Sequence, residues 1–132
     1  MSDPCICIAV RKASRKLTAR YDAALEAVGI NLAQFSLLRN IARHQPVSLT
    51  GLAEIVELDR STLGRNVRVL KRMGLAAILP GDDLREATLS LTEAGQQTLG
   101  QAVPIWEGTQ DEIQRRLGVA GTAQLEALLG SL

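Results

Sequence analysis

The order of segments between residues 48 and 91 constrains the fold of this chain more than any other feature of its sequence. A short helical pattern begins at a cap, Ser48 or Thr50, and ends in a tight turn at residues 57–59. A second helical pattern follows directly and runs to Met73. Two short helices joined by a turn of three or four residues predict a helix-turn-helix.

A hairpin pattern follows the second helix without a linker. Residues 75–79 are an apolar run, residues 80–83 read Pro-Gly-Asp-Asp, and residues 87–91 alternate between apolar and polar side chains. Proline, glycine and aspartate favour turns, and alternation with a period of two is typical of a strand. The sequence therefore predicts a mainly α fold with a small β-hairpin wing (α+β), that is, a winged helix-turn-helix.

Longer amphipathic helices are predicted on both sides of this unit. Apolar residues recur at spacings of three and four over residues 4–28 and 92–118, and residues 120–132 give a final helix. Pro104 lies inside the second pattern, so we expect a kink or a break near residues 100–104.

We expect a single structural unit with three parts. Residues 1–30 form an N-terminal dimerisation helix, residues 31–98 form the winged helix-turn-helix lobe, and residues 99–132 form C-terminal dimerisation helices. The lobe begins with a helix that Asn31 caps, and Gln34 three residues later completes a pattern typical of a capping box.

The second helix of the helix-turn-helix, capped by Asp59 or Ser61, separates into two faces on a helical wheel. An apolar arc that must face the core consists of Leu63, Val67 and Leu70. The opposite face carries a serine and three arginines: Ser61, Arg65, Arg68 and Arg72. Residues 59–72 hold five basic residues against one acidic residue, although the whole chain has a net charge of only +1. A basic island of this kind indicates a phosphate-binding surface.

This face predicts binding to double-stranded DNA, because a helix-turn-helix places its second helix in the major groove, with the N-terminal residues nearest the bases. Base readout is assigned to Ser61, Thr62 and Arg65. Arg68 can reach bases or phosphates, whereas Lys71 and Arg72 lie near the helix end and are assigned to phosphates.

Two further segments complete the predicted DNA-binding set. Thr50 belongs to the first helix of the helix-turn-helix, and Arg85 lies at the wing tip, where it can enter the minor groove. Asp83 is expected to orient an arginine rather than to meet phosphate itself.

The chain resembles the MarR family of regulators over essentially its whole length. The matching stretches are residues 32–38, 58–63 and 71–75, the Asp83-x-Arg85 pattern and Leu91-Thr92-x-x-Gly95. The resemblance implies an obligate dimer, formed by the first and last helices, that usually represses transcription and is released by a ligand or by oxidation. It also implies that Asp83 pairs with Arg65. Residues 77–78 and Glu86 occupy positions where relatives often carry basic residues, so we expect the wing to bind DNA weakly.

A homodimer is also expected from the residues alone. The apolar stripes over residues 6–28 and 113–132 need to be covered, and packing them across a two-fold axis achieves this. Two recognition helices would then read two half-sites about one helical turn apart, so the expected partner is a pseudo-palindromic operator.

Three interpretations stay open for Cys5 and Cys7. They can pack as small apolar residues in the dimer interface, they can sense oxidants, or they can bind a thiophilic metal. In a helix, residues two apart point about 200° away from each other, so a shared ligand or a disulfide needs an extended or frayed first turn.

A small organic effector is the other candidate signal. By the resemblance, an effector pocket lies between the dimerisation helices and the DNA-binding lobe, and the residues considered for it are Tyr21, Phe35, His44 and Trp106. No cofactor is predicted.

Other classes of protein are disfavoured. The sequence has no glycine-rich phosphate loop and no nucleophile elbow, so no enzyme activity is expected. A winged-helix interaction module that does not bind DNA is the alternative, and the three-arginine face argues against it. No apolar run approaches the length of about 20 residues that a membrane span needs, and a cytoplasmic location is expected.

Overall fold

The structure is a computed structural model that describes residues 3–81 and 86–132. Helices dominate it, and three short strands form one small sheet. The elements in chain order are α1 (Ile6–Leu25), η1 (Glu26–Val28), α2 (Leu32–His44), β1 (Val47–Ser48), α3 (Leu49–Val56), α4 (Arg60–Arg72), β2 (Ala76–Leu79), β3 (Thr88–Leu91) and α5 (Glu93–Gly130). The predicted α+β winged helix-turn-helix is confirmed.

The sheet has the order β1-β3-β2 and is antiparallel throughout. β2 and β3 pair from Ala76 opposite Leu91 to Leu79 opposite Thr88, which forms the wing hairpin. The two-residue strand β1 pairs with the outer side of β3 and was not predicted. A strand of two residues is too short to show the alternation of apolar and polar side chains that identifies strands in a sequence. Only its pairing with β3 defines it.

Four of the helices follow an N-cap residue whose side chain accepts a hydrogen bond from a backbone N–H of the first turn. Asn31 and Gln34 form both hydrogen bonds of a capping box at α2, as predicted. Ser48 rather than Thr50 caps α3, and Asp59 rather than Ser61 caps α4, each accepting a hydrogen bond from a backbone N–H. Both helices of the helix-turn-helix therefore begin where a polar side chain satisfies a free backbone N–H.

A leucine-rich core lies between α2, α4 and the sheet. Leu38, Leu52, Leu63 and Leu70 have no exposed surface, and Phe35 is only 2% exposed. The three apolar residues assigned to the inner face of α4 are all buried, which confirms the helical wheel. The core thus determines the direction in which the opposite face of α4 points.

α5 is one long helix that breaks at Gly118 rather than at Pro104. Gly118 has φ 76° and ψ 167°, whereas the residues around Pro104 keep helical dihedral angles. The expected interruption near residues 100–104 is therefore wrong, whereas the predicted separation of residues 92–118 from a final helix over residues 120–132 is confirmed by the break at Gly118. Pro104 removes one backbone N–H from the helix. Ala102 and Trp106 on either side of it pack on the core, and this packing stabilises the helical conformation through the proline.

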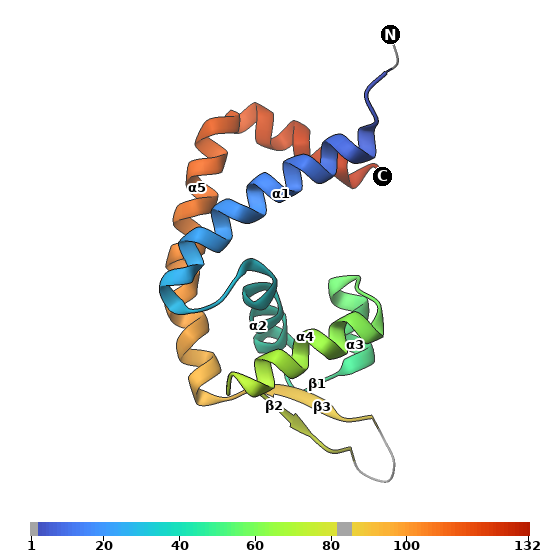
Figure 1. Cartoon of the computed structure of the whole chain (residues 1–132), viewed down its shortest axis with the longest axis vertical. Helices are drawn as coiled ribbons and strands as arrows, with labels where there is room; N and C mark the ends of the chain where they lie inside the picture. The colour runs from blue at the N-terminus through green and yellow to red at the C-terminus, as the bar shows by residue number, and fades with distance from the viewer. Residues whose placement is uncertain (1–2, 82–85) are drawn as a thin grey trace.

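α1 and the C-terminal part of α5 lie together away from the lobe that holds α2, α3, α4 and the hairpin (Figure 1). The hydroxyl of the buried Tyr21 on α1 donates a hydrogen bond to Gln110 on α5. Within the described ranges, no helix combines the length and the apolar character needed to cross a membrane.

Candidate nucleic-acid interface

The first turn of α4 is organised by the carboxylate of Asp59. It accepts hydrogen bonds from the Thr62 backbone N–H at 2.9 Å, from the Ser61 hydroxyl at 2.6 Å and from the Thr62 hydroxyl at 2.6 Å. The hydrogen bonds from Ser61 and then from Thr62 hold the pKa of Asp59 well below its ordinary value. The carboxylate is therefore ionised at neutral pH and acts only as an acceptor.

This arrangement sets the hydrogen-bonding polarity of Ser61 and Thr62, two of the three residues assigned to base readout. Each hydroxyl has one hydrogen, and both hydrogens are directed at Asp59, so the oxygens offer only lone pairs to other partners. A guanidinium nitrogen of Arg65 already donates to the Thr62 oxygen at 3.3 Å. The turn thus presents an acceptor at Ser61 beside a donor at Arg65.

The predicted outer face of α4 is exposed along its whole length. The exposed residues on it are Ser61, Arg65, Arg68, Lys71 and Arg72, and Thr62 is half-buried. Among the described residues the one ion pair joins Arg60 to Glu86. The positive charges of Arg68, Lys71 and Arg72 are therefore not neutralised by ion pairs within that part of the chain.

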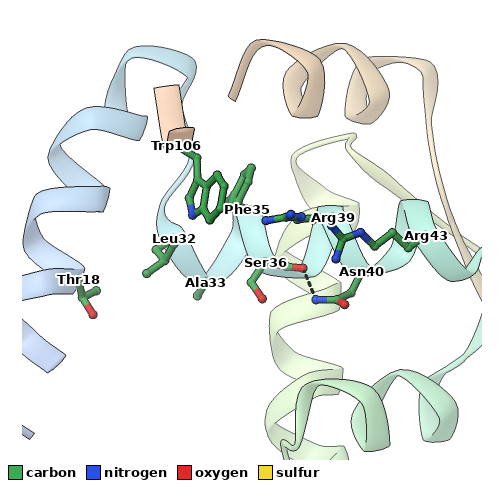
Figure 2. A pocket seen from close by; sticks show the side chains of 9 residues that line it. All are labelled: Thr18, Leu32, Ala33, Phe35, Ser36, Arg39, Asn40, Arg43 and Trp106. Carbon is green, nitrogen blue, oxygen red and sulfur yellow. Dashed lines mark hydrogen bonds between the residues drawn. The ribbon is translucent and has the colours of Figure 1, made fainter. Parts of the chain in front are cut away.

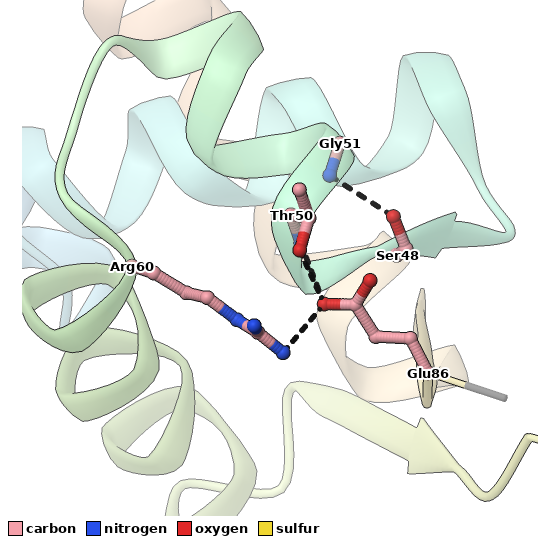
Figure 3. A network of polar contacts seen from close by, with 5 residues as sticks. All are labelled: Ser48, Thr50, Gly51, Arg60 and Glu86. Atoms are coloured by element: carbon pink, nitrogen blue, oxygen red, sulfur yellow. Dashed lines mark hydrogen bonds and ion pairs between the residues drawn. The ribbon is translucent and has the colours of Figure 1, made fainter. Parts of the chain in front are cut away.

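Thr50 lies at the start of α3, where it contacts the base of the wing (Figure 3). Its backbone N–H and its hydroxyl donate to one carboxylate oxygen of Glu86, at 3.0 and 2.6 Å. Arg60 reaches the same oxygen at 2.8 Å. The sequence pointed to Glu86 only as an acidic residue in the wing, and its partners could not be read from the sequence because they are 36 and 26 residues away. The predicted wing residues Asp83 and Arg85 lie outside the described residues.

A cavity of about 500 Å³ lies between α1, α2 and α5 (Figure 2). Phe35 and Trp106 stack in its wall with ring centroids 5.7 Å apart. The guanidinium carbon of Arg39 lies 4.7 Å from the centroid of the Trp106 ring, within the range of a cation–π contact. Arg43 also lines the cavity, so its wall is both aromatic and cationic.

Of the four residues considered for an effector pocket, the structure brings Phe35 and Trp106 together in this cavity. Tyr21 is buried between α1 and α5, and burial raises the pKa of its hydroxyl. His44 is exposed at the end of α2, with Nδ1 2.9 Å from the Asn40 carbonyl oxygen. Arg39 was not predicted, although it lies one helical turn after Phe35 and so shares its face.

The two cysteines are free thiols at the exposed start of α1. Cys5 is the N-cap residue and has an extended backbone, with φ −70° and ψ 118°, whereas Cys7 lies in the first helical turn. The 200° separation expected inside a helix therefore does not apply to this pair. In the described part of the chain no group of three or more cysteine, histidine or acidic side chains is arranged to hold a metal ion.

Comparisons with known proteins agree with this geometry. A family model described as the MarR family matches residues 28–86. The chain is similar to an uncharacterised HTH-type transcriptional regulator of Bacillus cereus, with 32% identity over 80 residues, which are 61% of this chain and 53% of that relative. It thus spans about half the length of that relative. It is also similar to the organic hydroperoxide resistance transcriptional regulator of Bacillus subtilis, with 27% identity over 76% of this chain and 69% of that protein.

Among solved structures, the chain is similar to the M. tuberculosis transcriptional regulator MosR in complex with DNA. The TM-score is 0.86 and the identity 35%, covering 97% of this chain and 95% of MosR. The match to the family model and this near full-length similarity together show that the chain belongs to the MarR family.

Proposed function

We propose that this chain is a transcriptional regulator that binds double-stranded DNA as a homodimer. The observation that carries the proposal is the outer face of α4, where Ser61, Arg65 and Arg68 are exposed while Leu63 and Val67 are buried on the inner face. A helix held in this way can enter the major groove with its polar side chains toward the bases. The similarity to MosR, which was solved in complex with DNA, supports the same function.

The chemistry of the first turn indicates which base edges suit it. Arg65 can donate two hydrogen bonds to N7 and O6 of guanine. Ser61 offers an acceptor, because its hydrogen is directed at Asp59, and the matching donors in the major groove are the amino groups of adenine and cytosine. Arg72 and Lys71, at the other end of α4, are suited to phosphates.

The test is a fluorescence anisotropy titration with two duplexes, one from the promoter region of the chain's own gene and one of mixed sequence. Arg65→Ala should cost about 1–3 kcal/mol on the promoter duplex and relax the preference between the two. Arg72→Ala should weaken both equally and make the salt dependence shallower by about one unit of slope. Arg43→Ala, at an exposed arginine of α2 outside the DNA-binding set and the dimerisation parts, is the control. Absence of salt-sensitive binding to any duplex would contradict the proposal.

The homodimer is proposed from the apolar side chains exposed on α1 and α5. Ile6 and Ile8 are 76% and 54% exposed, and Val119 and Leu128 are 92% and 67% exposed. Exposed apolar residues concentrated on two adjacent helices indicate a protein interface. Residues 1–30 and 99–132 would then be the dimerisation parts. Sedimentation should show a dimer for the wild type and a monomer with much weaker promoter binding for Leu128→Arg.

Two signals that release DNA are proposed, and each has its own support. The cavity beside Arg39, Phe35 and Trp106 suits a flat apolar anion, because its wall combines stacked rings with guanidinium groups. Trp106 is the single tryptophan of the chain, so its fluorescence reports on this cavity directly. Titration with benzoate should change that fluorescence in the wild type and not in Arg39→Ala.

Oxidation of the thiols is the second proposed signal. The exposure of Cys5 and Cys7 and the extended backbone at Cys5 support it, as does the similarity to a regulator of organic hydroperoxide resistance. The measurement is the DNA affinity of reduced protein, peroxide-treated protein and a variant with both cysteines replaced by serine. Identical affinities would eliminate the thiol signal and leave an effector in the cavity.

A further inference from the structure

Glu86 places a negative charge at the edge of the proposed DNA-binding surface. It lies two residues before β3, and one of its carboxylate oxygens is contacted by Thr50 and Arg60, as Figure 3 shows. The donors are the Thr50 N–H at 3.0 Å, the Thr50 hydroxyl at 2.6 Å and the Arg60 guanidinium at 2.8 Å. One side chain of the wing base therefore contacts the first turns of both helices of the helix-turn-helix.

The donors that Glu86 occupies are the kinds that hold DNA phosphates. Backbone N–H groups, hydroxyls and arginines supply most contacts to phosphate oxygens. Thr50 is a predicted DNA-binding residue, and Arg60 immediately precedes Ser61 in the first turn of α4. A carboxylate and a phosphate oxygen compete for such donors, because both are anionic acceptors.

The contact is also able to open. The Arg60 side chain is 63% exposed and the Glu86 side chain 31%, so solvent reaches the pair and screens its attraction. Ion pairs at exposed positions are weak for this reason. Arg60 can therefore exchange its internal carboxylate for an external phosphate.

We propose that Glu86 is a built-in competitor of the DNA backbone: it occupies Thr50 and Arg60 in the free protein and lowers the affinity for DNA of every sequence by the same factor. The inference rests on the proposed DNA-binding function. Because Thr50 and Arg60 would meet phosphates rather than bases, Glu86 leaves the sequence preference to Ser61 and Arg65. The acidic residue then reduces binding to non-operator DNA without altering the readout.

The experiment measures the affinity of full-length protein for the promoter duplex and for a 30-base-pair mixed-sequence duplex, the length being of the order needed for two half-sites. Titrations run between roughly 50 and 200 mM salt, where phosphate contacts change affinity strongly. Glu86→Ala should bind both duplexes more tightly by the same factor, about threefold to tenfold, with a salt slope steeper by about 0.9 for one regained phosphate contact. Glu86→Gln, which removes the charge and keeps the shape, should tighten both to a smaller extent.

Two further comparisons separate competition from a general change of charge. Glu93→Ala removes one exposed negative charge in the first turn of α5, outside both the predicted DNA-binding residues and the dimerisation parts, and should leave both affinities within twofold. In an Arg60→Ala background, Glu86→Ala should gain less than twofold, because the arginine that it releases is absent.

Several results would overturn the inference. If Glu86→Ala and Glu86→Gln bind both duplexes with unchanged or weaker affinity while melting like the wild type, Glu86 supports the wing rather than competing with DNA. An equal gain from Glu93→Ala would reduce the effect to bulk charge, and a gain confined to the promoter duplex would make Glu86 a base-reading element. If the wild type and both variants bind neither duplex at any salt concentration, the proposed function fails together with this inference.

Discussion

Replacing Gly95 with alanine should destabilise the fold, because α5 begins too close to the backbone of Leu75 to admit a side chain. A Cβ atom on Gly95 would lie 1.9 Å from the Leu75 carbonyl oxygen and 2.9 Å from its carbonyl carbon. Ordinary van der Waals contact begins at about 3.4 Å. The start of α5 and the turn after α4 would therefore have to separate by more than an ångström.

This separation would break hydrogen bonds at the junction of the wing, α4 and α5. The Thr92 N–H donates to the Leu75 carbonyl at 3.1 Å, and the Thr92 hydroxyl donates to the Gly74 carbonyl at 2.6 Å. Overpacking costs about 1–3 kcal/mol, and each lost hydrogen bond about 0.5–1.5 kcal/mol. The higher helix propensity of alanine returns up to about 1 kcal/mol. We therefore expect Gly95→Ala to lower the free energy of unfolding by about 2–4 kcal/mol.

The assay is urea unfolding followed by Trp106 fluorescence, with all variants at one protein concentration because dimer formation contributes to stability. Gly100→Ala is the matched control: it lies in the same helix, is exposed, and has no neighbour within 4 Å of a Cβ atom. It should stabilise the protein by about 0.5–1 kcal/mol. If Gly95→Ala were as stable as the wild type, or if both variants shifted the transition equally, the close approach to Leu75 would not determine stability and the reasoning would be wrong.

Three further changes test the core, the cap of α4 and the break in α5. Leu63 has no exposed surface, so Leu63→Ala should lower the unfolding free energy in urea by about 2–5 kcal/mol. Ile55→Ala, at a side chain 41% exposed, should cost about 1 kcal/mol or less. Asp59→Asn should flatten the acid limb of melting temperature against pH. The lowered pKa of Asp59 gives stability that is complete above its unfolded value of 3.8 and is lost as the pH falls further. Gly118→Ala should cost about 1–3 kcal/mol in the same urea assay, since its φ and ψ are accessible essentially to glycine alone.

Local patterns in the sequence were sufficient to predict most of the lobe. The apolar spacing of α4 placed Leu63, Val67 and Leu70 in the core, and therefore the opposite side chains at the surface. Capping residues located the helix ends to within a residue or two, but they left a choice at α4. Asp59 proved to be the cap because its carboxylate can accept from several donors at once, whereas Ser61 is one of those donors.

Features that depend on contacts between distant segments could not be predicted. Arg39 lines the cavity only because the fold brings Trp106 of α5 over α2, and in the sequence it is one more charged residue on a helix. The contact of Glu86 with Thr50 and Arg60 likewise needs the wing to fold back onto the helix-turn-helix. Of the two interruptions of α5 that the sequence predicted, the one near Pro104 is wrong and the one at residue 118 is confirmed. A proline deletes one hydrogen bond that packing can replace, while Gly118 adopts a backbone conformation that no helix contains.

The distribution of charge along α4 separates the proposed tasks of its two halves. At the N-terminal end, Arg60 pairs with Glu86, and Arg65 donates to the Thr62 hydroxyl oxygen, whose hydrogen is directed at Asp59. At the C-terminal end, Arg68, Lys71 and Arg72 are exposed, and none takes part in an ion pair among the described residues. Attraction to phosphates should therefore come mainly from the C-terminal half, and discrimination between bases from the N-terminal turn. It follows that salt should change the affinity of this protein for DNA far more than its preference for one sequence over another.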